Sequence, residues 1–146
     1  FSKQLALETG ITRLNADEWV DNNFSLDEQG RNWDKCFATA VENIWQEAEN
    51  LIKNRNDVIL DLGFWSLEER NFARQKAKSW NAKVKHYYIF AQDKIMLSRL
   101  KQRKGKVAET NFKKFYKIKE LFEEPYQDEN AVIIHNDNKT LPQYDN

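Results

Sequence analysis

Hydrophobic and polar positions change their period several times along this chain, which predicts strands alternating with helices. Short apolar runs typical of strands cover residues 11–15, 58–61, 84–90 and 131–135. Apolar residues at helical spacing lie between them, at residues 17–20, 31–54, 67–80, around 95–100 and 110–123. This alternation predicts an α/β fold with a parallel sheet and right-handed crossovers.

The segment Val58-Ile59-Leu60-Asp61-Leu62-Gly63-Phe64-Trp65-Ser66 is the most informative part of the pattern. A β-branched run ends in an acid, a glycine and two large aromatic residues. Ser66 and Glu69 have the spacing of a capping box that begins the next helix. Ligands of open α/β sheets bind beyond the carboxyl ends of the strands, which is where we expect Asp61.

The first residues of the chain already have the pattern of a helix interior. Phe1-Ser2-Lys3-Gln4-Leu5-Ala6-Leu7 is amphipathic, and Gly10 is placed to end the helix in a left-handed conformation. We therefore expect a further segment to precede Phe1.

Composition narrows the class of protein. The 146 residues fit a single domain, 1–146, with no internal repeat, and 23 basic residues balance 23 acidic ones. Nucleic acid is therefore not an expected partner. Cys36 is the only cysteine, which excludes a disulfide framework, and no apolar run is long enough to cross a bilayer. We expect a cytoplasmic protein that does not bind a membrane; its oligomeric state stays open.

Four segments, in order, resemble a P-loop kinase of the adenylate-kinase-like superfamily. They are similar to small ATP-binding, AAA-type kinase proteins grouped with zeta toxin, chloramphenicol phosphotransferase, gluconate kinase and polynucleotide 5′-kinase. The segments are Phe1-Ser2-Lys3-Gln4-Leu5-Ala6, Leu14-Asn15-Ala16-Asp17-Glu18-Trp19, residues 60–70, and Arg99-Leu100-Lys101-Gln102-Arg103 leading to Phe122-Glu123-Glu124-Pro125. The resemblance implies a three-layer P-loop NTPase fold with a parallel sheet flanked by helices, and a lid at about residues 99–112.

The chain departs from this family pattern in one respect. It contains no G-x-x-x-x-G-K-[ST] phosphate loop, and its four glycines are Gly10, Gly30, Gly63 and Gly105. The resemblance places that loop and the first, central strand before Phe1, and implies ATP and Mg²⁺ as cofactors. We expect these 146 residues alone to be inactive.

Two acids carry the chemistry that the resemblance implies. Asp17 would accept or orient the proton of an acceptor hydroxyl, and Asp61 would hold Mg²⁺ through water. The alternatives are that Asp17 only caps the helix beginning at Glu18 or Trp19, and that Asp61 is structural.

Arg99 and Arg103 lie four residues apart, so one helical face can direct both guanidinium groups to the phosphates of ATP. Arg103 is in addition a candidate catalytic residue that neutralises charge on the transferring group. The alternative is a solvated basic face, because lysines crowd the same segment.

Five residues are candidates for contact with the phosphoryl acceptor. Gly63 permits close backbone approach, while Trp19, Phe64 and Trp65 have the apolar surface of a pocket wall or of the core. Arg70 has the charge for an anionic substrate, or for pairing with Glu68 or Glu69 on its own helix.

The nature of the acceptor is the least determined point. Polynucleotide kinases carry an arginine three residues after the catalytic acid, and this chain has Val20 there. That favours a small-molecule hydroxyl over a nucleic-acid end. Two alternatives to a small-molecule kinase stay open: a non-catalytic nucleotide-binding or interaction module with a degenerate P-loop fold, and a zeta-toxin-like kinase of a nucleotide sugar.

Overall fold

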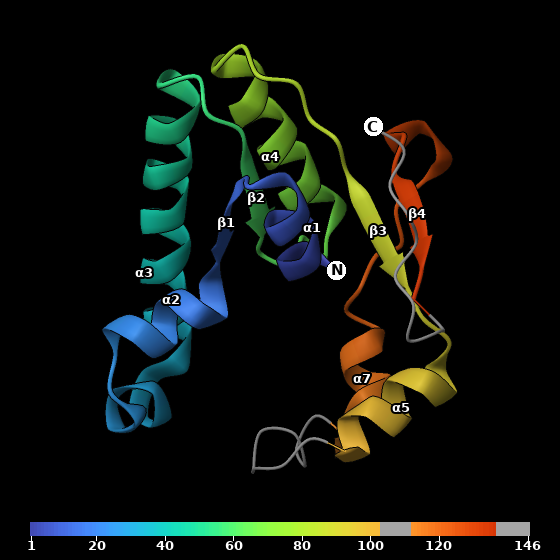
Figure 1. Ribbon diagram of the computed structural model, residues 1–146. Helices are drawn as coiled ribbons and strands as arrows, with labels where there is room; N and C mark the ends of the chain where they lie inside the picture. Colours follow the sequence, from blue (N-terminus) through green and yellow to red (C-terminus); the bar gives the residue numbers. More distant parts are fainter. Residues whose placement is uncertain (103–111, 137–146) are drawn as a thin grey trace. The chain divides into compact units, whose positions relative to one another are not determined.

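The computed structural model describes residues 1–102 and 112–136 and has a mixed α/β architecture (Figure 1). The chain divides into two compact units. The first unit contains Phe1–Gly63 and Ala77–Ala82, and the second contains Phe64–Lys76 and Lys83–Asn146. Each unit holds one pair of parallel strands.

The first unit is built on the parallel pair of β1 and β2, against which α1 and α3 both lie. Its elements are α1 (Ser2–Thr9), β1 (Thr12–Asn15), α2 (Ala16–Asn23), α3 (Leu26–Lys53) and β2 (Val58–Asp61). Gly10 ends α1 at φ 70°, and its N–H donates to the carbonyl of Ala6. The left-handed helix end expected from the sequence is confirmed.

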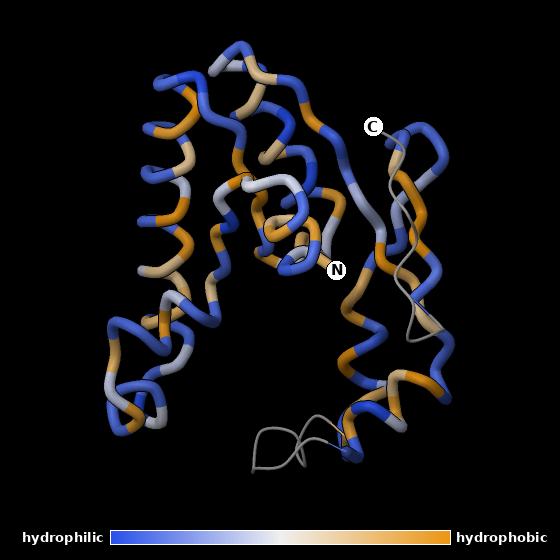
Figure 2. The backbone as a smooth tube through the Cα atoms, in the orientation of Figure 1, coloured by the Kyte–Doolittle hydropathy of each residue, from blue (hydrophilic) through white to orange (hydrophobic). Residues whose placement is uncertain are grey.

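One stripe of α3 forms most of the core of the first unit. Cys36, Ala40, Ile44 and Ala48 recur every four residues and are all buried, because this spacing keeps them on one helical face. Figure 2 shows hydrophobic and hydrophilic positions alternating along this helix. Val20 of α2 is fully buried in the same cluster.

The second unit is built on the parallel pair of β3 and β4, with aromatic side chains packed against it. It contains most of α4 (Leu67–Ser79), then β3 (Tyr87–Phe90), α5 (Asp93–Gln102), α7 (Phe115–Lys119), a 3₁₀ turn (Gln127–Glu129) and β4 (Val132–His135). β3 and β4 pair in parallel. Tyr88 of β3 stacks on Phe122, with ring centroids 5.5 Å apart.

The predicted order of strands and helices is confirmed over the described residues, and three elements differ most from their expected bounds. The strand expected at 84–90 begins only at Tyr87, because pairing with β4 is confined to residues 87–90. Within the range 110–123, the described residues are helical at 112–113 and in α7 (Phe115–Lys119), with an interruption at Lys114, which leaves helical geometry; residues 110–111 lie outside the described residues. The helix expected at 31–54 begins earlier, at Leu26, and is kinked at Asn32.

Parallel pairing of the strands is likewise confirmed. A single domain and one three-layer sheet stay predictions, since the strands pair two by two in separate units. Over the described part of the chain, every helix is too short or too polar to span a bilayer.

The α3 stripe generates a stability prediction. Replacing Ile44 by Ala should lower the free energy of unfolding by about 2–5 kcal/mol. Ile44 is fully buried, so the substitution leaves a cavity enclosed by the neighbouring side chains. Urea denaturation measures the change. The matched control is Leu26→Ala on the same helix, where the side chain is 85% exposed and a change below about 0.5 kcal/mol is expected. Equal losses in both variants would contradict this packing.

Candidate functional site

The carboxyl ends of β1 and β2 lie side by side in the first unit. The parallel register pairs Asn15 with Asp61, the last residue of each strand. Asp17 follows two residues after Asn15, in the first turn of α2. The structure therefore brings the two acids expected from the sequence to the same edge of the strand pair.

Asn15, and not Asp17, caps α2. Its backbone is extended, and its side-chain oxygen accepts a hydrogen bond from the N–H of Glu18 at 2.9 Å. Its side-chain amide donates to the carbonyl oxygen of Asp61 at 3.0 Å. Asn15 thus caps α2 and also connects this helix to β2. The Asp17 carboxylate therefore does not cap the helix, as one alternative had it.

The Asp61 carboxylate is held in place by hydrogen bonds from two residues, Ser2 and Arg13. Its Oδ2 accepts from Ser2 Oγ at 2.6 Å and from Nη2 of Arg13 at 2.6 Å. Partial burial alone would raise the pKa of Asp61, but the hydrogen bonds and the positive charge of Arg13 outweigh it and keep the pKa below its ordinary value. Asp61 is therefore ionised at neutral pH.

Arg13 links the strand ends to the first turn of α2. Its side chain is 11% exposed, and its Nη1 donates to Glu18 at 2.6 Å while Nη2 contacts Asp61. Glu18 also pairs with Lys3 of α1 at 2.6 Å. The hydrogen bonds from Lys3 and Arg13 lower the pKa of Glu18. α1, β1, α2 and β2 are thus joined by one charged network.

Asp17 differs electrostatically from Asp61. Partial desolvation raises its pKa, and the negative charges of Asp21, Asp61 and Glu18 raise it further. The residue as a whole nevertheless stays exposed to solvent. A raised pKa makes a carboxylate a better proton acceptor, the property expected of a general base.

The segment after Asp61 has an unusual backbone. Gly63 has φ 89° and Phe64 has φ 47°, two consecutive residues in the left-handed region. For a residue with a side chain this costs about 1 kcal/mol or more, and such strain is concentrated at functional sites. Trp65 follows with 42% of its surface exposed. The capping box expected at the start of α4 is confirmed: the Glu69 N–H donates to Ser66 Oγ, and the Ser66 N–H donates to the Glu69 carboxylate.

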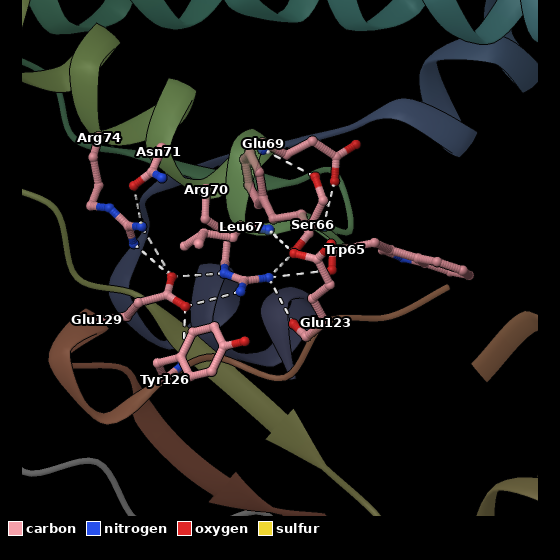
Figure 3. A network of polar contacts seen from close by, with 11 residues as sticks. Trp65, Ser66, Leu67, Glu69, Arg70, Asn71, Arg74, Glu123, Tyr126 and Glu129 are labelled. Atoms are coloured by element: carbon pink, nitrogen blue, oxygen red, sulfur yellow. Dashed lines mark hydrogen bonds and ion pairs between the residues drawn. The ribbon is translucent and has the colours of Figure 1, made fainter. Parts of the chain in front are cut away.

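Arg70 lies at the centre of a polar network in the second unit (Figure 3). It is 2% exposed and forms a two-pronged ion pair with Glu129, 2.8 Å from Nε and 2.9 Å from Nη2. Arg74 donates to the same carboxylate at 3.0 Å. The partner of Arg70 is therefore 59 residues away in the sequence, not Glu68 or Glu69 on its own helix.

The remaining candidates are spread over both units. Trp19 packs against the core of the first unit and meets Phe24 edge to face, with ring centroids 6.0 Å apart. Arg99 belongs to the second unit, where its Nη2 donates to the carbonyl of Asn136 at 2.7 Å. Arg103 lies outside the described residues.

Asp61 is the candidate for holding a metal ion. Among residues 1–102 and 112–136, His, Cys, Asp and Glu side chains form no group of three or more that could bind one directly. Asp61 is ionised, but its Oδ2 already accepts from a cation, Arg13. These residues therefore fit an indirect role, in which one carboxylate binds a metal-bound water and other ligands come from the nucleotide.

Parallel strands joined through helices, with acids at the carboxyl end of the β1–β2 pair, are typical of α/β proteins. Residues 1–125 match the family described as AAA domain, and the chain belongs to that family. Domains of this kind have a P-loop NTPase-like fold and generally bind a nucleotide together with Mg²⁺. Neither a curated protein nor a solved structure matches the chain.

Sequence reasoning missed Arg13, Asn15 and Glu129. A signal existed for the first two: Arg13 and Asn15 alternate with buried Leu14, so they share the face of β1 opposite the core. The sequence holds no comparable signal for Glu129, since a single acid in a polar segment has no periodic pattern.

The Arg70–Glu129 pair generates a prediction about acid stability. Hydrogen bonds from Arg70 lower the pKa of Glu129 from 4.5 to about 2. A carboxylate with a depressed folded-state pKa contributes stability that is fully present above pH 4.5 and is lost as the pH falls toward about 2.

Thermal melts of wild type and Glu129→Gln should therefore converge as the pH falls from 5 to about 2. Glu68→Gln is the control, because Glu68 is a solvent-exposed acid on the same helix as Arg70. A difference between wild type and Glu129→Gln that stays constant over this pH range would contradict the assignment.

Proposed function

We propose that this chain is part of an ATP-dependent phosphotransferase, a kinase that acts on a hydroxyl group of a small molecule. The observation that carries the proposal is the β1–β2 register, which sets an ionised Asp61 beside the helix turn that bears Asp17. Phosphoryl transfer requires mainly positioning and charge neutralisation, and two acids at adjacent strand ends serve those needs.

Asp17 is the residue that accepts or orients the proton of the acceptor hydroxyl. It is exposed, it does not cap its helix, and its raised pKa improves its basicity. Its backbone is fixed by the bond from the N–H of Glu18 to Asn15 and by the Arg13–Glu18 pair. A preorganised base of this kind needs no rearrangement when the acceptor binds.

Asp61 is the residue that orients the water shell of Mg²⁺, which would neutralise charge on the β- and γ-phosphates of ATP. In this proposal α1 has the place of the helix that follows the phosphate-binding loop in P-loop kinases. Ser2, in the first turn of α1, donates to Asp61 at 2.6 Å, so α1 already contacts the acid that the proposal assigns to Mg²⁺.

Further residues complete the proposed assignment. Arg99 and Arg103 are the residues proposed to bind the phosphates of ATP. Gly63, Phe64 and Trp65 are candidate contacts of the acceptor, with Trp19 as a further candidate, whereas Arg70 is 2% exposed and can act on the acceptor only indirectly. Trp65 has the exposure that a contact residue needs.

The acceptor is a small molecule in this proposal. Val20 occupies the position of the phosphate-gripping arginine of polynucleotide kinases, and it is fully buried in the core. The first turns of α2 thus present no cation at that position to a nucleic-acid phosphate.

One observation favours a second candidate, a non-catalytic nucleotide-binding or interaction module. Arg13 pairs with Asp61 at 2.6 Å and neutralises the carboxylate that Mg²⁺ would need. A chain in which this ion pair is permanent has no use for a metal ion there.

Substitution of Asp17 by Asn distinguishes the two candidates. In the full-length protein, kcat for phosphoryl transfer from Mg-ATP to a hydroxyl acceptor should fall about a hundredfold or more, because the base is lost. The KM for ATP should change less than about twofold, because Asp17 does not contact the nucleotide in this assignment. Steady-state kinetics measures both.

The matched control is Asp21→Asn, which removes a negative charge from an exposed position of the same helix, close to the Asp17 carboxylate. It should leave kcat within about threefold of wild type. Equal losses in the two variants would indicate a general effect of charge, and a fully active Asp17→Asn variant would refute the role given to Asp17.

A further inference from the structure

Arg70 contacts the strained segment after Asp61 through its backbone. While Nε and Nη2 bind Glu129, Nη1 points to three carbonyl oxygens, those of Phe64 at 3.2 Å, Trp65 at 3.3 Å and Glu123 at 2.9 Å (Figure 3). A buried guanidinium is suited to this because its donors are fixed in one plane.

The segment at 64–65 needs such a support. Phe64 lies at φ 47°, a conformation that an aromatic residue keeps only when its surroundings determine it. The Arg70 bond to its carbonyl supplies one restraint. A second comes from Glu123, whose N–H donates to the Trp65 carbonyl at 2.9 Å and whose carboxylate accepts from the N–H of Leu67 at 2.7 Å.

Arg70 is itself held firmly. Glu129, whose side chain is 4% exposed, accepts from Arg70, from Arg74 and from the N–H of Tyr126. Breaking a buried pair of this kind leaves an uncompensated charge, so the guanidinium stays where it is. The indole of Trp65, in contrast, extends away from the network and is 42% exposed (Figure 3).

We propose that Arg70 is a positioning residue: it holds the Phe64–Trp65 backbone in its strained conformation and so determines how this aromatic pair is presented to the phosphoryl acceptor. The acceptor part of this proposal rests on the kinase function proposed above. The backbone part stands on the contacts alone, and the two parts have separate readouts.

The test compares Arg70→Lys with Arg74→Lys in the full-length protein. A lysine at 70 keeps the charge near Glu129 but has a single nitrogen, which cannot serve the carboxylate and the three carbonyls together. Arg74 is the matched control, since it shares Glu129 and otherwise bonds the side chain of Asn71.

The backbone readout is fluorine NMR of 5-fluorotryptophan-labelled protein, with the Trp65 resonance assigned through Trp65→Phe. We expect Arg70→Lys to shift or broaden this resonance and to increase chymotrypsin cleavage at Phe64 or Trp65 about tenfold, whereas Arg74→Lys changes neither. If Arg70→Lys leaves both unchanged, or if Arg74→Lys produces the same changes, the positioning role is overturned.

The acceptor part is tested by comparing the effects of Arg70→Lys on two constants, the KM for the acceptor and the KM for ATP. Arg70→Lys should raise the KM for the acceptor about tenfold and leave the KM for ATP within about twofold, a selectivity that general destabilisation does not produce. Equal effects on both constants overturn the acceptor part. Absence of phosphotransfer in wild type defeats the proposed function, while the NMR result still decides the backbone part.

A second variant covers failure of Arg70→Lys to fold. The double variant Arg70→Met/Glu129→Gln removes the charges of the buried pair together and leaves no side-chain donor at residue 70 for the carbonyls. It should change the Trp65 resonance in the same way, and an unchanged resonance overturns the proposal.

Discussion

The in-register parallel pairing of β1 with β2 is the constraint on which the candidate site depends. Because Asn15 pairs with Asp61, the two strands end at the same level, and the acid of β2 meets the start of α2. A slip of one strand by one residue would turn its side chains to the other face of the pair. The bond from Asn15 to the Asp61 carbonyl and the Arg13 ion pair both require this register, so one pairing aligns strand ends, helix start and charge.

The order of elements was predictable because it depends on local periodicity, whereas several bounds depend on distant partners. The stripe of α3 follows from residues four apart in the sequence. The earlier start of that helix was also visible in principle, since Ser25 and Glu28 form a capping box that the prediction overlooked. The late start of β3 at Tyr87 was not visible, because it is set by the length of its partner, β4.

The positions of the two acids in the site were predictable from the sequence, but their hydrogen-bond and ion-pair partners were not. Asp17 and Asp61 were found because each lies at or just after the end of an expected strand and matches the family pattern, and the register brings them to one edge. The contacts that tune them join residues 48 apart for Arg13 and Asp61, and the contact that holds the next segment joins residues 59 apart for Arg70 and Glu129. No local spacing encodes such pairs. The sequence therefore predicted where the acids lie but did not predict which cations pair with them.

The most direct test of the central claim is to measure nucleotide binding by the full-length protein with and without Mg²⁺. Isothermal titration calorimetry gives the ATP affinity of wild type and of Asp61→Asn under both conditions. If Asp61 orients the water shell of Mg²⁺, wild type binds ATP more tightly with Mg²⁺ than without it, and Asp61→Asn loses about tenfold or more of that gain. Equal affinity with and without Mg²⁺, or an undiminished gain in Asp61→Asn, would contradict the account and favour a binding module in which Arg13 is the permanent counter-ion of Asp61.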